Sequence, residues 1–165
     1  MVIFLADRAD IQARQLHRRI AIRFQTDGYF EAVQLRVTEP REPGPYRVVA
    51  RTDPQLFFGD EAYPVASARI EVGFQLRWHE DYNHYWFNWI EPERDFLLGW
   101  HQDDGHPNLG PVHVQVSQGG EPIKHAPATF VDAHPMAILE ARLEQLGDVL
   151  SRVQWDDRTI TRIDW

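Results

Sequence analysis

The pattern of apolar and polar residues predicts a series of short β-strands followed by one long helix. In the clearest strand, residues 69–78, five apolar side chains alternate with polar residues or glycine: Ile70, Val72, Phe74, Leu76 and Trp78. Such alternation is typical of a strand with one buried face. Apolar segments at residues 84–90 and 96–101 follow the turn-like sequences EDYN and EPERD. We therefore expect an antiparallel meander over residues 69–101, and a further strand at residues 111–117.

The C-terminal part of the chain changes to a helical period. Four leucines recur at the spacing i, i+4, i+7 and i+11: Leu139, Leu143, Leu146 and Leu150. They form the apolar stripe of an amphipathic helix over residues 132–153, with Asp132 as N-cap and Pro135 in the first turn. We expect this helix to pack across the sheet. Residues 158–165 favour a last edge strand, with Thr161, Ile163 and Trp165 on one side.

The N-terminal part, residues 5–51, is predicted to form a short helix and a β-hairpin. The helix would occupy residues 6–19, and the hairpin would turn at Asp27–Gly28, a dipeptide typical of such turns. The apolar faces of its two strands would be formed by Ile20, Ile22 and Phe24, and by Val33, Leu35 and Val37. Three prolines then predict a loop at residues 39–45, before a short strand at residues 46–51.

These elements define the fold class as α+β: a mainly antiparallel sheet, a meander of six or seven strands, packed against one long C-terminal helix. The 165 residues have the length of one domain, with a histidine-rich meander at residues 66–117 as its centre. Strand–helix–strand repeats and glycine-rich phosphate loops are both missing from the pattern, so we expect no nucleotide cofactor.

Composition excludes several classes of protein. The chain has no cysteine, which excludes disulfides, thiolate metal sites and a cysteine nucleophile. Its N-terminus does not resemble a signal peptide, and no apolar run reaches the length of a membrane span. We expect a cytoplasmic protein that does not contact membranes.

Charge is unevenly distributed. The net charge is −8, and residues 1–51 hold nine arginines against six acidic residues, so the remaining residues carry about −11. An acidic total argues against broad, non-specific binding to duplex nucleic acid. A local group of arginines is still able to hold a phosphate, and the acidic part suits a basic protein partner.

Candidate chemistry gathers in GWHQDDGHPNLGPVH, residues 99–113, which contains three of the eight histidines. His101 with Asp103, and His106 with Asp104, form pairs in which a carboxylate is able to orient an imidazole. With His113 as the first candidate general base, this set favours metal-independent cleavage of RNA by acid–base catalysis, without a cofactor.

Two alternatives for this stretch stay open. His101, Asp103, His106 and His113 are nitrogen and oxygen ligands that suit zinc, manganese or iron, which would indicate a metal-dependent hydrolase. The residue types are equally typical of a polar loop between two strands. We interpret the other histidines as structural: His79 and His84 at a turn, His125 in a loop and His134 at a helix start.

Aromatic and basic residues complete the candidate site. Trp78, Phe87 and Trp89 are expected in the core, whereas Trp86 and Trp100 suit the opposite face, where aromatic rings are able to stack on RNA bases. Arg69 and Arg77 lie on the polar face of their strand and are candidates to bind a phosphate.

Residues 97–150 resemble the TumE-like toxin component of bacterial and archaeal toxin–antitoxin pairs. Gly99 and Trp100 match the end of a strand in that family, His113 matches the first histidine of a His-x-His pair, and Phe130 with the leucine stripe matches the helix. His101 replaces the usual aspartate, and Gln115 replaces the second histidine.

The resemblance implies a small growth-inhibiting protein that acts on RNA or nucleotides and is neutralised by a cognate antitoxin of the helix-turn-helix type. A non-catalytic module that binds a protein partner through its acidic part and exposed aromatic residues is the main alternative to an enzyme.

Overall fold

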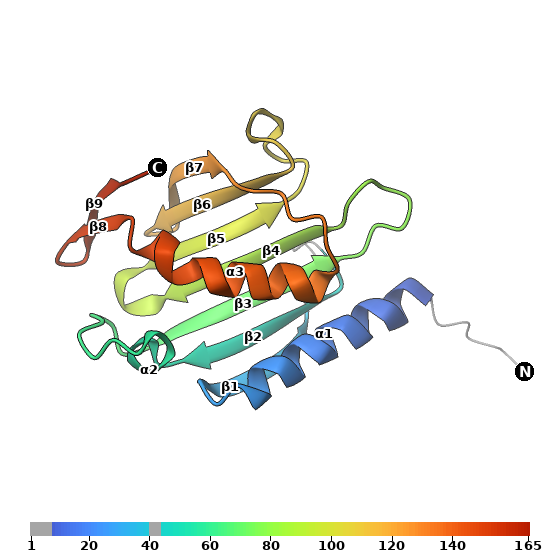
Figure 1. The fold of residues 1–165 in the computed structure, drawn as a ribbon, viewed down its shortest axis with the longest axis horizontal. Coiled ribbons are helices and arrows are strands. Elements are labelled where there is room, and N and C mark those ends of the chain that lie inside the picture. Colours follow the sequence, from blue (N-terminus) through green and yellow to red (C-terminus); the bar gives the residue numbers. More distant parts are fainter. Residues whose placement is uncertain (1–7, 40–43) are drawn as a thin grey trace, which may run out of the picture.

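The protein forms one seven-stranded antiparallel sheet in which every strand pairs with its neighbours in the chain (Figure 1). The computed structural model describes residues 8–39 and 44–165. The strands of this sheet are β1 (Phe30–Val37), β2 (Tyr46–Thr52), β3 (Ala68–Gln75), β4 (His84–Glu91), β5 (Phe96–Gln102), β6 (Val112–Gln118) and β7 (Glu121–Pro127). The predicted α+β class and the predicted meander are confirmed.

Helices cover one face of this sheet and leave the other open. The helices are α1 (Arg8–Thr26), α2 (Pro54–Phe58), α3 (Pro135–Leu150) and two 3-10 turns, η1 (Pro92–Arg94) and η2 (Pro107–Leu109). Both α1 and α3 lie across the same face of the sheet (Figure 1). A second, two-stranded sheet follows α3 and consists of β8 (Val153–Asp156) and β9 (Thr159–Ile163).

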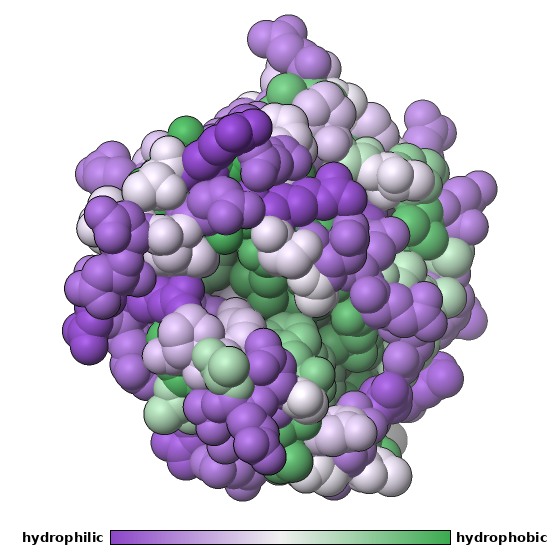
Figure 2. Space-filling model, turned by 60° about the vertical axis from the view of Figure 1, so that its left-hand side comes forward, coloured by the Kyte–Doolittle hydropathy of each residue, from purple (hydrophilic) through white to green (hydrophobic). Residues whose placement is uncertain are grey.

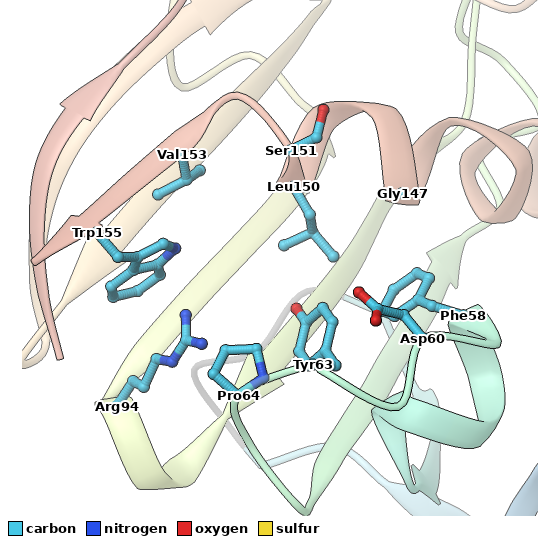
Figure 3. Close-up of a pocket in the computed structure, with 10 residues that line it drawn as sticks. All are labelled: Phe58, Asp60, Tyr63, Pro64, Arg94, Gly147, Leu150, Ser151, Val153 and Trp155. Atoms are coloured by element: carbon cyan, nitrogen blue, oxygen red, sulfur yellow. The ribbon is translucent and has the colours of Figure 1, made fainter. Parts of the chain in front are cut away.

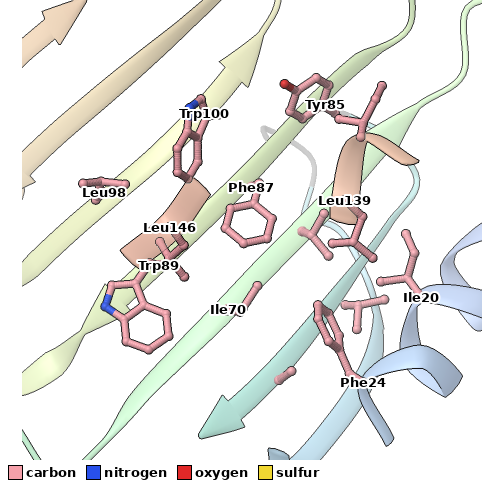
Figure 4. Close-up of a cluster of buried hydrophobic side chains, with 14 of the residues drawn as sticks. Ile20, Phe24, Ile70, Tyr85, Phe87, Trp89, Leu98, Trp100, Leu139 and Leu146 are labelled. Atoms are coloured by element: carbon pink, nitrogen blue, oxygen red, sulfur yellow. The ribbon is translucent and has the colours of Figure 1, made fainter. Parts of the chain in front are cut away.

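The core lies between the sheet and these two helices. Ile20 and Phe24 of α1 and Leu139 and Leu146 of α3 meet apolar side chains of β3, β4 and β5 (Figure 4). The sheet contributes, among others, Ile70, Phe87, Trp89, Leu98 and Trp100. Since strand side chains alternate between faces, their neighbours in sequence point to the open face of the sheet.

The predicted hairpin at residues 19–39 is wrong, because its first strand is the second half of α1, although its second strand is present as β1. Ile20 and Phe24 are fully buried, whereas Ile22 is 59% exposed. In a helix, residues i and i+4 share a face, whereas residue i+2 points to the opposite side. Ile20 and Phe24 therefore face the core while Ile22 faces away. The hairpin that forms instead joins β1 to β2, and Val37 near its turn is 74% exposed.

Smaller corrections concern the ends of the elements. β3 ends at Gln75, so Trp78 lies beyond the strand and is 58% exposed instead of packed in the core. His134, not Asp132, is the N-cap of α3, and its side chain accepts a hydrogen bond from the backbone N–H of Met136.

The last predicted strand is present as β9, but it pairs with β8 and not with the main sheet. Residues 40–43 of the predicted proline-rich loop, and residues 5–7 of the predicted N-terminal segment, lie outside the described residues. In the part of the chain that the structure describes, no helix combines the length and the apolar character needed to cross a membrane.

Candidate functional site

The histidines of β5, β6 and β7 lie side by side on the open face of the sheet. His101 of β5 pairs directly with His113 of β6, and Gln115 of β6 pairs with His125 of β7. Directly paired residues in an antiparallel sheet point to the same face, with their side chains in contact distance. The strand register therefore brings three histidines together.

A fourth histidine reaches the same place from a loop. His106 precedes η2 in the connection between β5 and β6, and its ring centroid lies 4.4 Å from that of His113 and 4.6 Å from that of His125. The ring of His101 lies 5.4 Å from that of His113 on the other side. We call His101, His106, His113 and His125 the histidine cluster. The loop between β5 and β6 folds back so that His106 reaches the histidines of the strands.

His113 is the central residue of the histidine cluster. His113 is only 1% exposed, and among the residues that the structure describes neither of its ring nitrogens has a hydrogen-bond partner. Leaving a buried polar group without a partner costs about 1–3 kcal/mol. A ligand or metal ion bound to His113 would remove this cost.

Two neighbours of His113 are held in place by side-chain amides. Nε2 of His101 lies 2.9 Å from Oδ1 of Asn88, and Nε2 of His125 lies 3.1 Å from Oε1 of Gln115. An amide oxygen only accepts hydrogen bonds, so Nε2 of each ring carries the proton and Nδ1 keeps its lone pair. Histidines that bind metals are oriented in the same way by hydrogen bonds to their second nitrogen.

Three histidines of this cluster, His101, His113 and His125, have a lowered pKa, which favours their neutral form. Burial lowers the pKa of His101 to about 4, and the nearby His113 adds to the effect. Burial also lowers the pKa of His113 against the opposing effect of Asp103, and lowers the pKa of His125 together with the neighbouring His106. Only a neutral imidazole has a free lone pair for a metal ion.

The spacing of the ring nitrogens fits a metal ion. His106, His113 and His125 each offer one nitrogen, and the three atoms lie within 4.8 Å of one another. Tetrahedral zinc with bonds of about 2.0–2.1 Å places its ligand atoms about 3.4 Å apart, so side-chain rotations that bring the nitrogens closer by up to about 1.4 Å would complete the site. His101, Asp103 and His113 form a second group of the same spacing.

Asp104 does not belong to this site. Its carboxylate accepts hydrogen bonds from the hydroxyl of Tyr82, at 2.8 Å, and from Nη1 of Arg77, at 3.0 Å. These two contacts, in that order, lower the pKa of Asp104. The predicted pair of His106 with Asp104 is therefore wrong, because Asp104 turns toward the β3–β4 loop while Asp103 faces the histidines.

The two predicted phosphate-binding arginines are both in ion pairs. Arg77 contacts Asp104, Glu80 and the ring of His84. Arg69 donates to Glu71 at 2.7 Å. Neither guanidinium lies in a contact with the histidine cluster that the structure records.

The two tryptophans that we assigned to the open face lie on different faces of the sheet. Trp86 lies there, directly paired with His101, and its ring covers Gly73, where a Cβ atom would come within 2.2 Å of it. Trp100 belongs to the core instead, 2% exposed and packed on Phe87, so its predicted role on the open face is wrong. Phe87 and Trp89 are buried as predicted.

A cleft of about 360 Å³ borders the histidine cluster on the side of β3 and β4. Its walls include Trp86, Asn88, His101 and Asp103. A molecule in this cleft therefore contacts one wall of the cluster directly, while His106 and His125 lie on the far side of His113.

His125 is the residue that our sequence reasoning missed. We assigned it to a loop, and residues 121–127 indeed lack a run of apolar residues. The Gly119–Gly120 pair that precedes them is a signal for a two-residue hairpin turn and predicts a strand there. Both glycines adopt a positive φ in the turn between β6 and β7.

Comparison of the chain with protein-family models, with curated proteins and with solved structures gives no match. The resemblance to TumE-like toxins, and the antitoxin partner that it implies, stay predictions. Function has to be argued from the site itself.

Proposed function

We propose that this protein binds a divalent transition metal ion through His106, His113 and His125 and that it is a metal-dependent hydrolase. The observation that carries the proposal concerns His113, which is buried and finds no hydrogen-bond partner for either ring nitrogen in the described part of the chain. A bound cation would supply that partner. The neutral form of the neighbouring histidines supports the same conclusion.

Three imidazole ligands are typical of catalytic rather than structural zinc. Structural zinc sites use four protein ligands, whereas catalytic sites use three and leave one position for water. An ion held by these three histidines would supply Lewis-acid chemistry, which lowers the pKa of a bound water to about 7 in known sites of this kind. His101 and Asp103 lie at the cleft side of His113, where they are placed to orient a substrate and to accept a proton.

Metal-independent cleavage of RNA is the second candidate. It is favoured by one observation, the lowered pKa of His113, which keeps that ring free to act as a base. His113 is only 1% exposed, so RNA has little access to it as a base. Arg69 and Arg77 are both ion-paired, so neither is a free cation for the phosphate. We rank it below the metal-dependent reaction.

Metal analysis of protein purified without a histidine tag tests the proposal. We expect about one zinc, manganese or iron ion per chain, and loss of that ion in the His125→Gln and His113→Leu variants. His84→Gln is the matched control, because His84 is also half-buried on the open face but lies outside the histidine cluster. Absence of metal from the wild type, after titration with each ion, would overturn the proposal.

An activity assay separates the two reactions. The protein is incubated with a bis-aryl phosphodiester and with RNA, before and after removal of metal by a chelator. We expect hydrolysis that the chelator abolishes and added metal restores. Cleavage of RNA that is unchanged by the chelator and lost in His113→Leu would instead support the metal-independent ribonuclease, and with it the toxin hypothesis.

A further inference from the structure

A second cavity lies on the helix-covered side of the sheet, away from the histidine cluster. It has a volume of about 460 Å³ and lies between α2, the end of α3, η1 and β8 (Figure 3). On the face of the molecule that carries these elements, Figure 2 shows a hollow with hydrophobic residues at its bottom and hydrophilic residues around it. This volume is typical of sites for small organic molecules.

The cavity contains one buried cation. The side chain of Arg94 is only 5% exposed, and its guanidinium points into the cavity beside the ring of Trp155 (Figure 3). Its Cζ lies 4.2 Å from the centre of that ring. Among the described residues, the guanidinium of Arg94 donates no hydrogen bond, and its nearest carboxylate oxygen is Oε2 of Glu91, 3.6 Å from Nε.

Glu91 offers Arg94 only part of a counter-charge. Its other oxygen, Oε1, accepts hydrogen bonds from the hydroxyl of Tyr63 at 2.5 Å and from Nε1 of Trp89 at 2.9 Å. Burial, and then the charge of Glu91, raise the pKa of Tyr63, so this hydroxyl stays protonated and keeps donating. One oxygen of the Glu91 carboxylate is therefore taken up by Tyr63 and Trp89, and Nη1 and Nη2 of Arg94 remain as donors.

The other walls of the cavity are mainly apolar. Phe58, Leu150, Val153 and Trp155 line it, and Asp60 stands exposed at its side, where its carboxylate accepts a hydrogen bond from the N–H of Ala62. Apolar walls with a single convergent polar group are the usual composition of a small-molecule site. A ligand with an apolar body and one strong acceptor matches this arrangement.

Gly147 of α3 borders the same cavity. A Cβ atom at this position would meet only the ring of Phe58, at 3.8 Å, so packing does not require glycine. Alanine would favour the helix by about 0.8–1 kcal/mol. Packing therefore does not explain Gly147, and the glycine makes the helix less stable. Its effect at this position is to leave the cavity wider than a larger side chain would.

We propose that this cavity binds a small monocarboxylic acid with an aromatic or branched alkyl body, whose carboxylate meets the guanidinium of Arg94. The planar guanidinium is suited to a carboxylate because two parallel N–H groups are able to donate to its two oxygens. The ring or alkyl group lies against Leu150, Val153 and Phe58. This site and the histidine cluster lie on opposite faces of the sheet, so either is able to exist without the other.

Binding of phenylacetate and of 4-methylpentanoate, each compared with its neutral amide, tests this site. We expect the acids to shift the NMR signals of Leu150, Val153 and Trp155, with an affinity roughly tenfold higher than that of the amides, since a charge-assisted hydrogen bond contributes about 1.5–3 kcal/mol. Equal affinity of acid and amide, or no shift of these signals at millimolar acid, would overturn the proposal.

Variants of Gly147 and Arg94 complete the test. Gly147→Met fills the cavity and should abolish binding, whereas Gly147→Ala, which keeps most of the space, should bind within about threefold of the wild type. Arg94→Lys keeps the charge beside Glu91 and should bind the acids at least about tenfold more weakly, because the two-pronged contact is lost. Undiminished binding by folded Gly147→Met would place the ligand elsewhere and contradict the proposal.

Discussion

At the scale of single residues, Gly99 leaves the space in which Asn88 orients His101 of the histidine cluster. A Cβ atom at this position would come within 2.0 Å of Oδ1 of Asn88 and within 2.9 Å of the backbone oxygen of Phe87. The missing side chain therefore leaves room for Asn88 to cross from β4 and accept the hydrogen bond from His101. From the sequence we interpreted this glycine only as the end of a strand. Its contact with Asn88 explains why a residue without a side chain is needed at this position.

We predict that Gly99→Ala slows hydrolysis of the phosphodiester about tenfold while the sheet and the zinc affinity persist, because His101, which is not one of the three metal ligands, loses its orienting partner, and such a loss typically costs 10- to 100-fold in activity. The rate of hydrolysis measures the activity, calorimetric titration with zinc measures the affinity, and circular dichroism confirms the fold. Asn88→Ala alone should cause a similar loss of activity. The double variant should lose little more than either single one, and fully additive losses would show that the two residues act separately.

At the scale of elements, α1 shows why alternation of apolar residues is an unreliable signal when the segment is short. Ile20, Ile22 and Phe24 fit a strand, but Leu16, Ile20 and Phe24 also fit a helix at i, i+4 and i+8, and the helix continues the segment before it. α3 was recognised because its leucine stripe is long enough to exclude a strand. β7 was missed because its residues are mostly polar or proline, and its place in the sheet depends on pairing with β6.

We predict that Phe24→Ala lowers the free energy of unfolding by about 3–5 kcal/mol, since it empties a fully buried site beneath α1. Ile22→Ala is the matched control, and it should change stability by no more than about 0.5 kcal/mol, because Ile22 is mostly exposed. Urea denaturation measures both values. Similar losses from the two variants would indicate that the side chains share a buried face, as in the strand that we first expected.

At the scale of the whole molecule, α1 is tied to the sheet by a buried histidine as well as by apolar packing. Nε2 of His17 accepts a hydrogen bond from the backbone N–H of Phe74 in β3, at 3.0 Å, and Nδ1 lies 2.6 Å from the backbone oxygen of Ala13. Burial lowers the pKa of His17, against the smaller effect of the Ala13 oxygen, which raises it. The folded protein therefore needs His17 to be neutral.

We predict that the protein loses stability as the pH falls below about 6.5, the ordinary pKa of histidine, toward the lowered pKa of the folded state. In that range the unfolded chain binds a proton at His17 that the folded chain does not, so acid favours unfolding. Above the ordinary pKa this contribution to stability is complete. Urea denaturation at pH 7.5 and pH 5.5 measures the loss.

His17→Gln should make the pH dependence smaller, because glutamine is able to accept from Phe74 but does not titrate. The wild type and His17→Gln differ at no other residue, so the comparison isolates His17. An equal slope in wild type and His17→Gln would mean that His17 does not take up a proton on unfolding.

The sequence by itself determined the α+β class, the order of the central strands and the C-terminal helix, because these depend on local periodicity. It also placed His101, Asp103, His106 and His113 in one candidate site, since they come from one short stretch. Only the tertiary structure decided that His125 joins them, that Asp104 turns away and that Trp100 enters the core. Those outcomes depend on strand register and on the path of a loop, which are set by pairing between distant segments and leave little trace in local sequence.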